Sequence, residues 1–363
     1  MNKIIYLDAA ASYLKPQVVV DAQRDFLLND YANSGRGICA RAANVDMIVA
    51  DTRRKIAEFI GADERQIVFT GGATDGINRV VKLLNVRQDV LVGVSDLDHH
   101  SACLPWVASG AKIVKCDLDV CLNIDVEKIP CVDVLVVTAM SNVLGVGQDV
   151  EAIVKTARKK NPNVVVVVDA AQYVVHNDID VKKWDCDFLV FSGHKIGADT
   201  GVGVLYIKNP DDVQPDKFGG GMVNRLDANG DFLLLDAPEK FEAGTLPLTQ
   251  IAGFGYAIDD LEKNRPDLGL IRYMYDELLK EPKVKIVSSR EAALLSFVVD
   301  GMHVLDFGAR VGVRGVCARV GNMCASWIHE RMRLDGTIRL SVGGYNNVDD
   351  AREAIKIIKE LIK

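Results

Sequence analysis

The chain has 363 residues, more than one compact core usually holds, so its length predicts two domains within one fold. Hydrophobic residues make up 49% and charged residues 26% of the sequence, which is typical of globular proteins and excludes disordered and fibrous classes. The net charge of -7, with Lys and Arg scattered along the chain, argues against a broad nucleic-acid surface.

The sequence shows no membrane, secretory or metal-binding pattern. The segment Met1 to Asp8 has too few apolar residues and turns acidic too soon for a secretory signal. The longest apolar run, Val164–Val168, fits a buried strand and falls far short of the roughly 20 residues that a bilayer requires. The 8 cysteines form no CxxC pair and lack the His spacing of a zinc site. We therefore expect a cytoplasmic protein that binds no metal, membrane or nucleic acid.

Short β-branched runs alternate with segments of helical periodicity in the first part of the chain, a pattern typical of an α/β fold with a mainly parallel sheet. Predicted strands are Ile67–Thr70, Val90–Val94, Val134–Thr138, Val164–Val168, Phe188–Phe191 and Gly203–Ile207. Val45–Ile60 and Gly76–Leu84 carry apolar residues three and four apart, which predicts covering helices.

The pattern changes after about residue 250 to helices separated by short strands. The predicted helices are Ile251–Lys263, Leu268–Leu279 and Val348–Ile362. These elements predict a smaller C-terminal α/β domain, residues 251–363, beside a large domain, residues 1–250. We expect the N-terminal segment, residues 1–15, to pack on the smaller domain.

A lysine follows one of the predicted buried strands. The segment Phe191-Ser192-Gly193-His194-Lys195 ends that strand and precedes the glycine-rich segment Gly197–Gly203. Burial disfavours the charged form of a lysine, so its pKa falls and its amine can condense with an aldehyde. The alternative for this position taken alone is an ordinary lysine in a surface loop.

An aspartate follows the most apolar predicted strand. Asp169 could cap a helix N-terminus. It could also pair with a protonated pyridine nitrogen, which helps a cofactor ring to withdraw electrons. Asp169 and Lys195 at the ends of neighbouring strands together predict a pyridoxal phosphate site, in which Lys195 carries the cofactor as a Schiff base.

Two further segments fit the same site. Thr70–Gly76 joins a strand to a helix, and its glycines let backbone N–H groups approach an anion at the positive end of the helix. Asp98-His99-His100 follows the strand Val90–Val94 and places an imidazole at the same sheet edge, where it could stack on a cofactor ring. A single histidine in a loop is otherwise commonly structural.

Seven motifs run in order along nearly the whole chain. They are Tyr6–Ser12, Gly72–Asn78, Asp98–His100, Ser141–Gly145, Asp169–Gln172, Ser192–Lys195 and Phe241–Thr245. In residues and spacing they resemble the class V aminotransferases, specifically the cysteine desulfurase and selenocysteine lyase family. The resemblance implies a pyridoxal-phosphate-dependent transferase fold of type I, similar to aspartate aminotransferase.

The resemblance also implies how the cofactor ring would be bound. Lys195 would form the Schiff base, and Asp169 would pair with the pyridine nitrogen. Gln172 would hydrogen-bond the ring oxygen. His99 would stack on the ring as part of the catalytic set, and Asn142 would contact cofactor or substrate.

The phosphate group would have its own set of ligands, again by resemblance. Ala73, Thr74, Ser192 and His194 would hold it from within the chain. Thr245 would reach in from a second subunit, because active sites of this family lie at a dimer interface. We therefore expect a homodimer.

The substrate side of the site depends on two arginines and a cysteine. Arg339 would clamp the substrate carboxylate, for which a guanidinium is best suited. Arg319–Ala325 resembles the active-site loop of the SufS-like desulfurases, which points to Cys324 as the nucleophile and Arg319 as a substrate neighbour. The loop departs from the family pattern, because Asn322 and Met323 stand where two histidines are usual. The competing interpretation is a buried cysteine at a helix start, although a helix N-terminus near Arg319 also lowers the pKa of a thiol.

These residues predict a cysteine desulfurase that converts L-cysteine to L-alanine and passes sulfur from Cys324 to an acceptor protein or thiol. Two other interpretations stay open. One is a different class V enzyme, namely an aminotransferase, lyase or racemase acting on another amino acid. The other is a sulfur-trafficking subunit with weak activity of its own. The pathways open to such an enzyme include iron–sulfur cluster assembly, and Arg36 would serve substrate entry or pack at the subunit interface.

Overall fold

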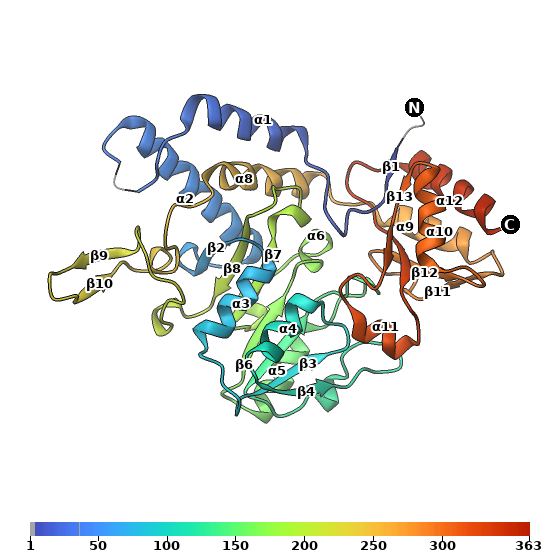
Figure 1. Cartoon of the computed structure of the whole chain (residues 1–363), viewed down its shortest axis with the longest axis horizontal. Coiled ribbons are helices and arrows are strands. Elements are labelled where there is room, and N and C mark those ends of the chain that lie inside the picture. Colours follow the sequence, from blue (N-terminus) through green and yellow to red (C-terminus); the bar gives the residue numbers. More distant parts are fainter. Residues whose placement is uncertain (1–3, 36) are drawn as a thin grey trace.

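A mainly parallel sheet forms the centre of the molecule, which we describe from a computed structural model covering residues 4–35 and 37–363 (Figure 1). Its strand order is β2-β8-β7-β6-β5-β3-β4. The strands are β2 (Ile67–Thr70), β3 (Leu91–Ser95), β4 (Lys112–Cys116), β5 (Val134–Thr138), β6 (Val165–Asp169), β7 (Phe188–Ser192) and β8 (Gly203–Ile207). β8 runs antiparallel to both of its neighbours, and the other pairs are parallel. The predicted α/β fold is confirmed, and β4 is a partly exposed edge strand that the hydrophobic pattern missed.

Helices cover both faces of this sheet, and the pleat decides which side chain meets which helix. Successive residues of a strand point to opposite faces. Along β6, Val168 joins a core with one group of helices and Val167 joins a core with another. The first group is α2 (Ala40–Ile60), α5 (Val150–Lys160) and α8 (Leu248–Lys263), and the second is α3 (Ala73–Leu83) and α4 (His100–Ala108). Burial on both faces explains why the central strands are almost wholly apolar.

Apart from the cores on the two faces of the large sheet, the C-terminal part of the chain has a core of its own, here called the second core, around a smaller sheet that Figure 1 shows beside the large one. Its sheet has the order β11-β12-β15-β14. These strands are β11 (Val284–Ile286), β12 (Leu295–Val299), β15 (Thr337–Leu340) and β14 (Arg319–Gly321). The helices of this core are α9 (Leu268–Leu278), α10 (Val304–Val313) and α12 (Val348–Ile362). From the other end of the chain, β1 (Ile5–Tyr6) pairs in parallel with β13 (Val316–Cys317).

The remaining elements are short. Among them are α1 (Gln17–Asp25), α6 (Tyr173–His176), α7 (Val181–Trp184), α11 (Ser326–Met332) and the hairpin of β9 (Val223–Leu226) and β10 (Phe232–Leu234), besides short π and 3-10 turns. Figure 1 shows the hairpin projecting from the body of the molecule.

The larger core of the large sheet and the second core divide the chain differently from its sequence order. Helix α8 packs on α1 and α2 and shares the larger core with them. The second core takes up the chain again at Leu270, and it also includes Ile5 and Leu7. An apolar stripe shows that α8 is amphipathic but not which partner covers it. The division into residues 1–250 and 251–363 therefore stays a prediction.

The described residues include no helix that is long and apolar enough to cross a membrane. The same part of the chain has no group of three or more His, Cys, Asp or Glu side chains placed to hold a metal ion. Arg36 and residues 1–3, for which the sequence raised expectations, lie outside the described residues.

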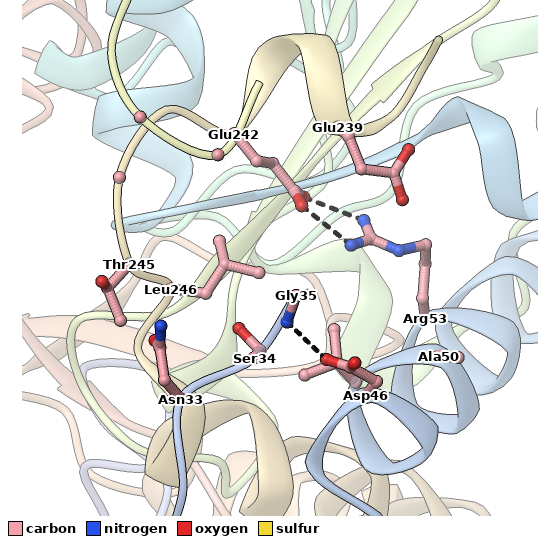
Figure 2. Close-up of a pocket in the computed structure, with 14 residues that line it drawn as sticks. Asn33, Ser34, Gly35, Asp46, Ala50, Arg53, Glu239, Glu242, Thr245 and Leu246 are labelled. Carbon is pink, nitrogen blue, oxygen red and sulfur yellow. Dashed lines mark hydrogen bonds and ion pairs between the residues drawn. The ribbon is translucent and has the colours of Figure 1, made fainter. Parts of the chain in front are cut away.

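A buried ion pair joins α2 to the segment before α8. The guanidinium of Arg53 donates to both carboxylate oxygens of Glu242 at 2.8 Å, and also to the carbonyl of Ile67 at 2.6 Å. Glu242 accepts in addition from the backbone N–H of Phe69 at 2.8 Å. Figure 2 shows the pair, whose side chains are only 7% and 4% exposed. The paired charges fix the Phe241–Thr245 segment against β2, an edge strand of the large sheet.

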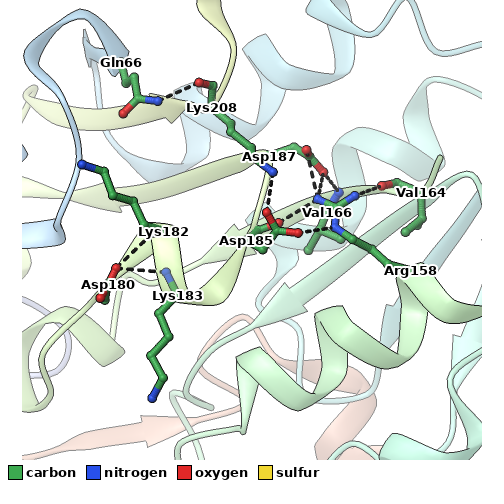
Figure 3. Close-up of polar contacts among 10 residues, drawn as sticks. All are labelled: Gln66, Arg158, Val164, Val166, Asp180, Lys182, Lys183, Asp185, Asp187 and Lys208. Carbon is green, nitrogen blue, oxygen red and sulfur yellow. Dashed lines mark hydrogen bonds and ion pairs between the residues drawn. The ribbon is translucent and has the colours of Figure 1, made fainter. Parts of the chain in front are cut away.

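A second polar network lies where β6 and β7 begin (Figure 3). One oxygen of Asp187 accepts from the backbone N–H of Val166 at 2.7 Å. Arg158 pairs with the same carboxylate at 3.1 Å and donates to the Asp185 carbonyl at 2.7 Å. Lys208, which follows β8, pairs with the Asp185 side chain. These contacts hold the amino ends of β6 and β7 together. Because the two strands are parallel, their carboxyl ends are also neighbours.

We predict that Glu242→Gln lowers the free energy of unfolding by about 3–5 kcal/mol, because it leaves the buried Arg53 charge uncompensated. The measurement is a urea titration of the purified variant. The control is Glu58→Gln, which removes an exposed partner of Arg54 and should cost less than about 1 kcal/mol. Equal losses in the two variants would contradict the role assigned to the buried pair.

Candidate active site

A cavity of about 290 Å³ opens at the carboxyl ends of β5, β6 and β7. Residues singled out from the sequence form most of its lining: Ala73, Thr74, His99, Asn142, Asp169, Gln172, Ser192, His194, Lys195, Arg319, Cys324 and Arg339. They come from segments far apart in the chain. They meet because parallel strands bring their carboxyl ends to one edge of the sheet, where α/β proteins bind ligands.

Lys195 lies in a short 3-10 turn directly after β7. Its Nζ donates to the carbonyl of Ala10 at 2.6 Å and to that of Ala11 at 3.2 Å. Burial, followed by the nearby positive charge of Arg339, lowers the pKa of the amine to about 8, and the carboxylate of Asp169 opposes this shift. A substantial fraction of the amine is therefore neutral near pH 8, which makes it a nucleophile and a base.

Asp169 is the last residue of β6 and is 5% exposed. Its Oδ1 accepts from the backbone N–H of Ala171 at 2.9 Å. Burial raises the pKa of this carboxyl, while that N–H and the charge of Lys195 lower it. No cationic side chain of the described residues donates a hydrogen bond to this carboxylate. Its environment fits a protonated ring nitrogen as the missing partner.

The turn between β2 and α3 brings backbone unusually close to β8. A Cβ on Gly203 would lie 2.5 Å from the Cα of Gly72, and Gly72 has a φ of 139°, so glycine is needed at both positions. The Ala73 N–H that opens α3 donates to Ser192 Oγ at 2.8 Å, and the Thr74 hydroxyl lies 2.7 Å from that of Ser101. A helix N-terminus ringed by hydroxyl groups on a cavity wall fits a phosphate.

Two imidazoles and one amide complete this wall. Burial, with the charge of Lys195 second, lowers the pKa of both His99 and His194 to about 4, so both rings are neutral at physiological pH. Nδ1 of His99 accepts from the backbone N–H of Ser101 at 3.1 Å and so caps α4. Gln172 donates to the Ala10 carbonyl at 2.8 Å, the same oxygen that Lys195 contacts.

Two guanidinium groups share one carboxylate on the substrate side. Asp8 lies 3.1 Å from Arg339 and 3.7 Å from Arg319. Arg339 also donates to the backbone carbonyl of Asn142 at 2.9 Å. Two buried atoms here, Nε of Arg339 and Oδ1 of Asn142, have no hydrogen-bond partner among the described residues. The surplus positive charge and the unused donor suit an added carboxylate.

Cys324 is exposed and lines the cavity, so the interpretation as a buried core cysteine is wrong. Met323 and Cys324 have φ values of 51° and 55°. Each left-handed residue that is not glycine costs about 1–2 kcal/mol. Asn322 Oδ1 accepts from the Cys324 N–H at 3.4 Å, and Met323 is 9% exposed within the larger core. The two residues that replace the expected histidines thus shape and anchor the loop.

Thr245 stands apart from the other predicted residues. It lines a separate pocket of about 750 Å³ together with Asn33, Ser34 and Asp46 (Figure 2). Within one chain it does not reach the cavity that contains Lys195. Its predicted contribution to a second subunit stays a prediction.

Several residues of the site were missed by reasoning from the sequence. Asp8 and the carbonyls of Ala10 and Ala11 lie in the Tyr6–Ser12 motif, which was recognised without a role. Ser101 comes directly after the two histidines and carried no signal of its own. Position in a motif was the one feature that could have identified Asp8 in advance.

Comparison with known proteins gives this arrangement a family. The Aminotransferase class-V model matches residues 5–353. The chain belongs to the class V aminotransferase family. A probable cysteine desulfurase of Vibrio cholerae is 31% identical to this chain, over 99% of the chain and 94% of the relative. One of Ureaplasma parvum is 33% identical over the same shares.

Solved structures of similar proteins show the same fold. The apo cysteine desulfurase of Thermococcus onnurineus superposes on this chain with a TM-score of 0.93 at 31% identity, covering 99% of this chain and 94% of the other. A cysteine desulfurase of Escherichia coli in an S-sulfonic acid form gives a TM-score of 0.90 at 31% identity over the same shares.

In the cofactor-free protein, we predict that the amine of Lys195 becomes reactive as pH rises through about 8, and not through the ordinary lysine value of 10.5. Only the neutral amine condenses with an aldehyde, so reductive methylation of the Lys195 peptide, followed by mass spectrometry, should rise with pH about that midpoint. Asp169→Asn removes a carboxylate that raises this pKa and should shift the midpoint lower. A wild-type midpoint near 10.5 would show that the amine is not desolvated.

Proposed function

We propose that this chain is a pyridoxal-phosphate-dependent cysteine desulfurase, which converts L-cysteine to L-alanine and passes the sulfur to an acceptor. One observation carries the proposal: the amine of Lys195, the thiol of Cys324 and the guanidinium of Arg339 line a single cavity. The cysteine desulfurases among the relatives, which align with nearly the whole chain, support it.

The residues of the cavity fit the cofactor. Lys195 would hold it through the amine, and Asp169, to which no cationic side chain of the described residues donates a hydrogen bond, would pair with the ring nitrogen. His99 offers a neutral ring for stacking, and Gln172 offers its amide to the ring oxygen. The phosphate would lie at the N-terminus of α3, with Ala73, Thr74, Ser192 and His194 around it.

Bound pyridoxal phosphate supplies an electron-withdrawing ring that stabilises negative charge next to the substrate α-carbon. The chain supplies the remaining functions. Arg339 and Arg319 hold and orient the substrate carboxylate. With the cofactor bound, Nζ of Lys195 would accept the α-proton. Formation of alanine would then need two protons, one on Cβ, which has lost sulfur, and one on Cα; Lys195 would supply one, and the proton released by the Cys324 thiol would balance the other. A pKa near 8 suits both directions of this transfer.

Cys324 carries the sulfur step. Its thiolate attacks Sγ of the bound cysteine, so that an S–S bond forms as the substrate Cβ–Sγ bond breaks. The products are alanine and a persulfide on Cys324, and no external oxidant is consumed. A thiol acceptor then takes the outer sulfur. With dithiothreitol, that sulfur leaves as sulfide, and the reagent is oxidised to its cyclic disulfide.

We further propose that the enzyme is a cytoplasmic homodimer. Thr245 lies outside the cavity of its own chain, in a pocket that a second copy could cover. Exposed apolar side chains gather on α1 and just after it, namely Val18, Val20, Leu27, Leu28 and Tyr31. A concentration of exposed large apolar side chains in one segment supports a role in an interface. The described cysteines are free thiols, in keeping with a reducing compartment.

The activity is tested by measuring alanine and sulfide released from L-cysteine by the cofactor-loaded protein with dithiothreitol. We expect equal amounts of the two products, and loss of sulfide release in Cys324→Ala, because that variant has no thiol to accept the sulfur. The matched control is Cys121→Ala, another exposed cysteine, which should behave as wild type. Full activity of Cys324→Ala would instead favour another class V reaction. If release by wild type required an added partner, it would favour the sulfur-trafficking subunit.

The subunit arrangement is tested by light scattering and by cofactor titration. We expect a mass of about twice the 39.6 kDa of one chain. Thr245→Val should weaken cofactor binding by about 10- to 100-fold, since it removes a hydrogen bond to a charged group. The control is Thr156→Val on α5, and a monomer that binds the cofactor at full strength would overturn the arrangement.

A further inference from the structure

The second histidine of the His99–His100 pair has no place in the chemistry proposed above. His100 is partly buried but does not line the cavity, and it begins α4 on the side of the large sheet. Its contacts lead away from the cofactor residues and toward the loop that carries Cys324.

His100 holds that loop at two points. Its backbone N–H donates to the carbonyl of Cys324 at 2.7 Å. Its ring Nε2 lies 2.9 Å from the hydroxyl of Ser326, whose backbone N–H also donates to Nε2, at 3.4 Å. The same residue therefore contacts the loop at the reactive cysteine and at the start of α11.

The loop needs such support, because Met323 and Cys324 are consecutive left-handed residues. An unsupported pair of this kind relaxes toward other backbone conformations. Both of their carbonyls are held from outside the loop. Nδ2 of Asn142 donates to the Met323 carbonyl at 2.8 Å, and the backbone N–H of His100 donates to the Cys324 carbonyl at 2.7 Å. Moving either carbonyl would rotate the Cys324 side chain.

The support crosses between two parts of the fold. α11 follows strands of the C-terminal sheet, yet it lies beside α4 (Figure 1), and Trp327 packs on the core that contains Cys103 and Trp106. Ala325 and Ile328 are fully buried in the larger core. These apolar contacts fix the position of the helix, whereas the contacts of His100 fix the orientation of the loop before it.

We propose that His100 is a positioning residue, which holds the Cys324 thiol in line with the substrate sulfur without touching either of them. This inference rests on the proposed function for its kinetic consequence. Misplacing a nucleophile by about 1 Å costs about 100-fold in rate. Loss of the ring contact should therefore slow formation of the persulfide and leave cofactor and substrate binding unchanged.

The test compares His100→Phe, His100→Gln and Ser326→Ala in the cofactor-loaded enzyme. His100→Phe keeps a ring but lacks the nitrogen, and it should slow single-turnover persulfide formation by about 10- to 100-fold. Its cofactor absorbance and its KM for L-cysteine should stay those of wild type. His100→Gln, whose amide can accept from Ser326, should recover most of the rate. Ser326→Ala should slow the step by about 3- to 10-fold.

Two controls separate positioning from general damage. Ser109→Ala makes the same change at the other end of α4 and should leave the rate unchanged. The double variant of His100→Phe with Ser326→Ala should be no slower than His100→Phe alone, because both remove one contact. Hydrogen exchange of the peptide spanning residues 319–329, measured without substrate, should be faster in His100→Phe and Ser326→Ala than in wild type.

The outcomes distinguish a failure of the proposed desulfurase function from a failure of the positioning role of His100. A wild-type protein that forms no persulfide would overturn the desulfurase function, and the exchange data would still report on the loop. If wild type forms the persulfide and both His100→Phe and Ser326→Ala match its rate, the positioning role of His100 is wrong and the desulfurase function stands. If His100→Phe loses the cofactor absorbance, the test rests on Ser326→Ala alone. A slower rate of persulfide formation in that variant then supports the positioning role, and a wild-type rate contradicts it.

Discussion

The desolvation of the Lys195 amine is the constraint on which the rest of the site depends. A lysine can be buried only where its donors are satisfied, and the carbonyls of Ala10 and Ala11 do this at 2.6 and 3.2 Å. Those carbonyls belong to a segment that crosses from β1 and lies over the carboxyl ends of the parallel strands. The N-terminal crossing, the sheet edge and the reactive amine therefore form one arrangement.

The sequence predicted those parts of the site that depend on local pattern. Lys195 and Asp169 were found because each directly follows an apolar strand, and strand direction then brings them together. The packing partner of α8 was not predicted, and Asp8 and His100 received no role. Each depends on contacts between distant parts of the chain, such as the Asp8–Arg339 pair, and hydrophobic periodicity carries no information about these. The left-handed backbone at Cys324 was equally invisible, since it is stabilised from outside by Asn142 and His100.

Unfavourable features gather around the cavity. Among the described residues, Nε of the buried Arg339 has no hydrogen-bond partner and no cationic side chain donates a hydrogen bond to Asp169, while Met323 and Cys324 occupy a strained region of the backbone. Such features persist only where the surrounding structure is rigid enough to hold them in place. Two polar clusters outside the cavity make the sheet rigid. They are the buried Arg53–Glu242 pair and the network at the start of β6 and β7. Stability and reactivity are therefore located at different edges of the same sheet.

The contact between Asp8 and Arg339 also has a meaning for how the protein is made. The two residues are separated by 331 positions in the chain. During synthesis, Asp8 must therefore wait for 331 further residues before its partner exists. The large sheet can form during synthesis, as N-terminal domains generally do. The two guanidinium groups and the thiol loop come more than 100 residues after the last strand of that sheet, so a chain cut between these regions should retain much of its sheet and yet lack a complete cavity.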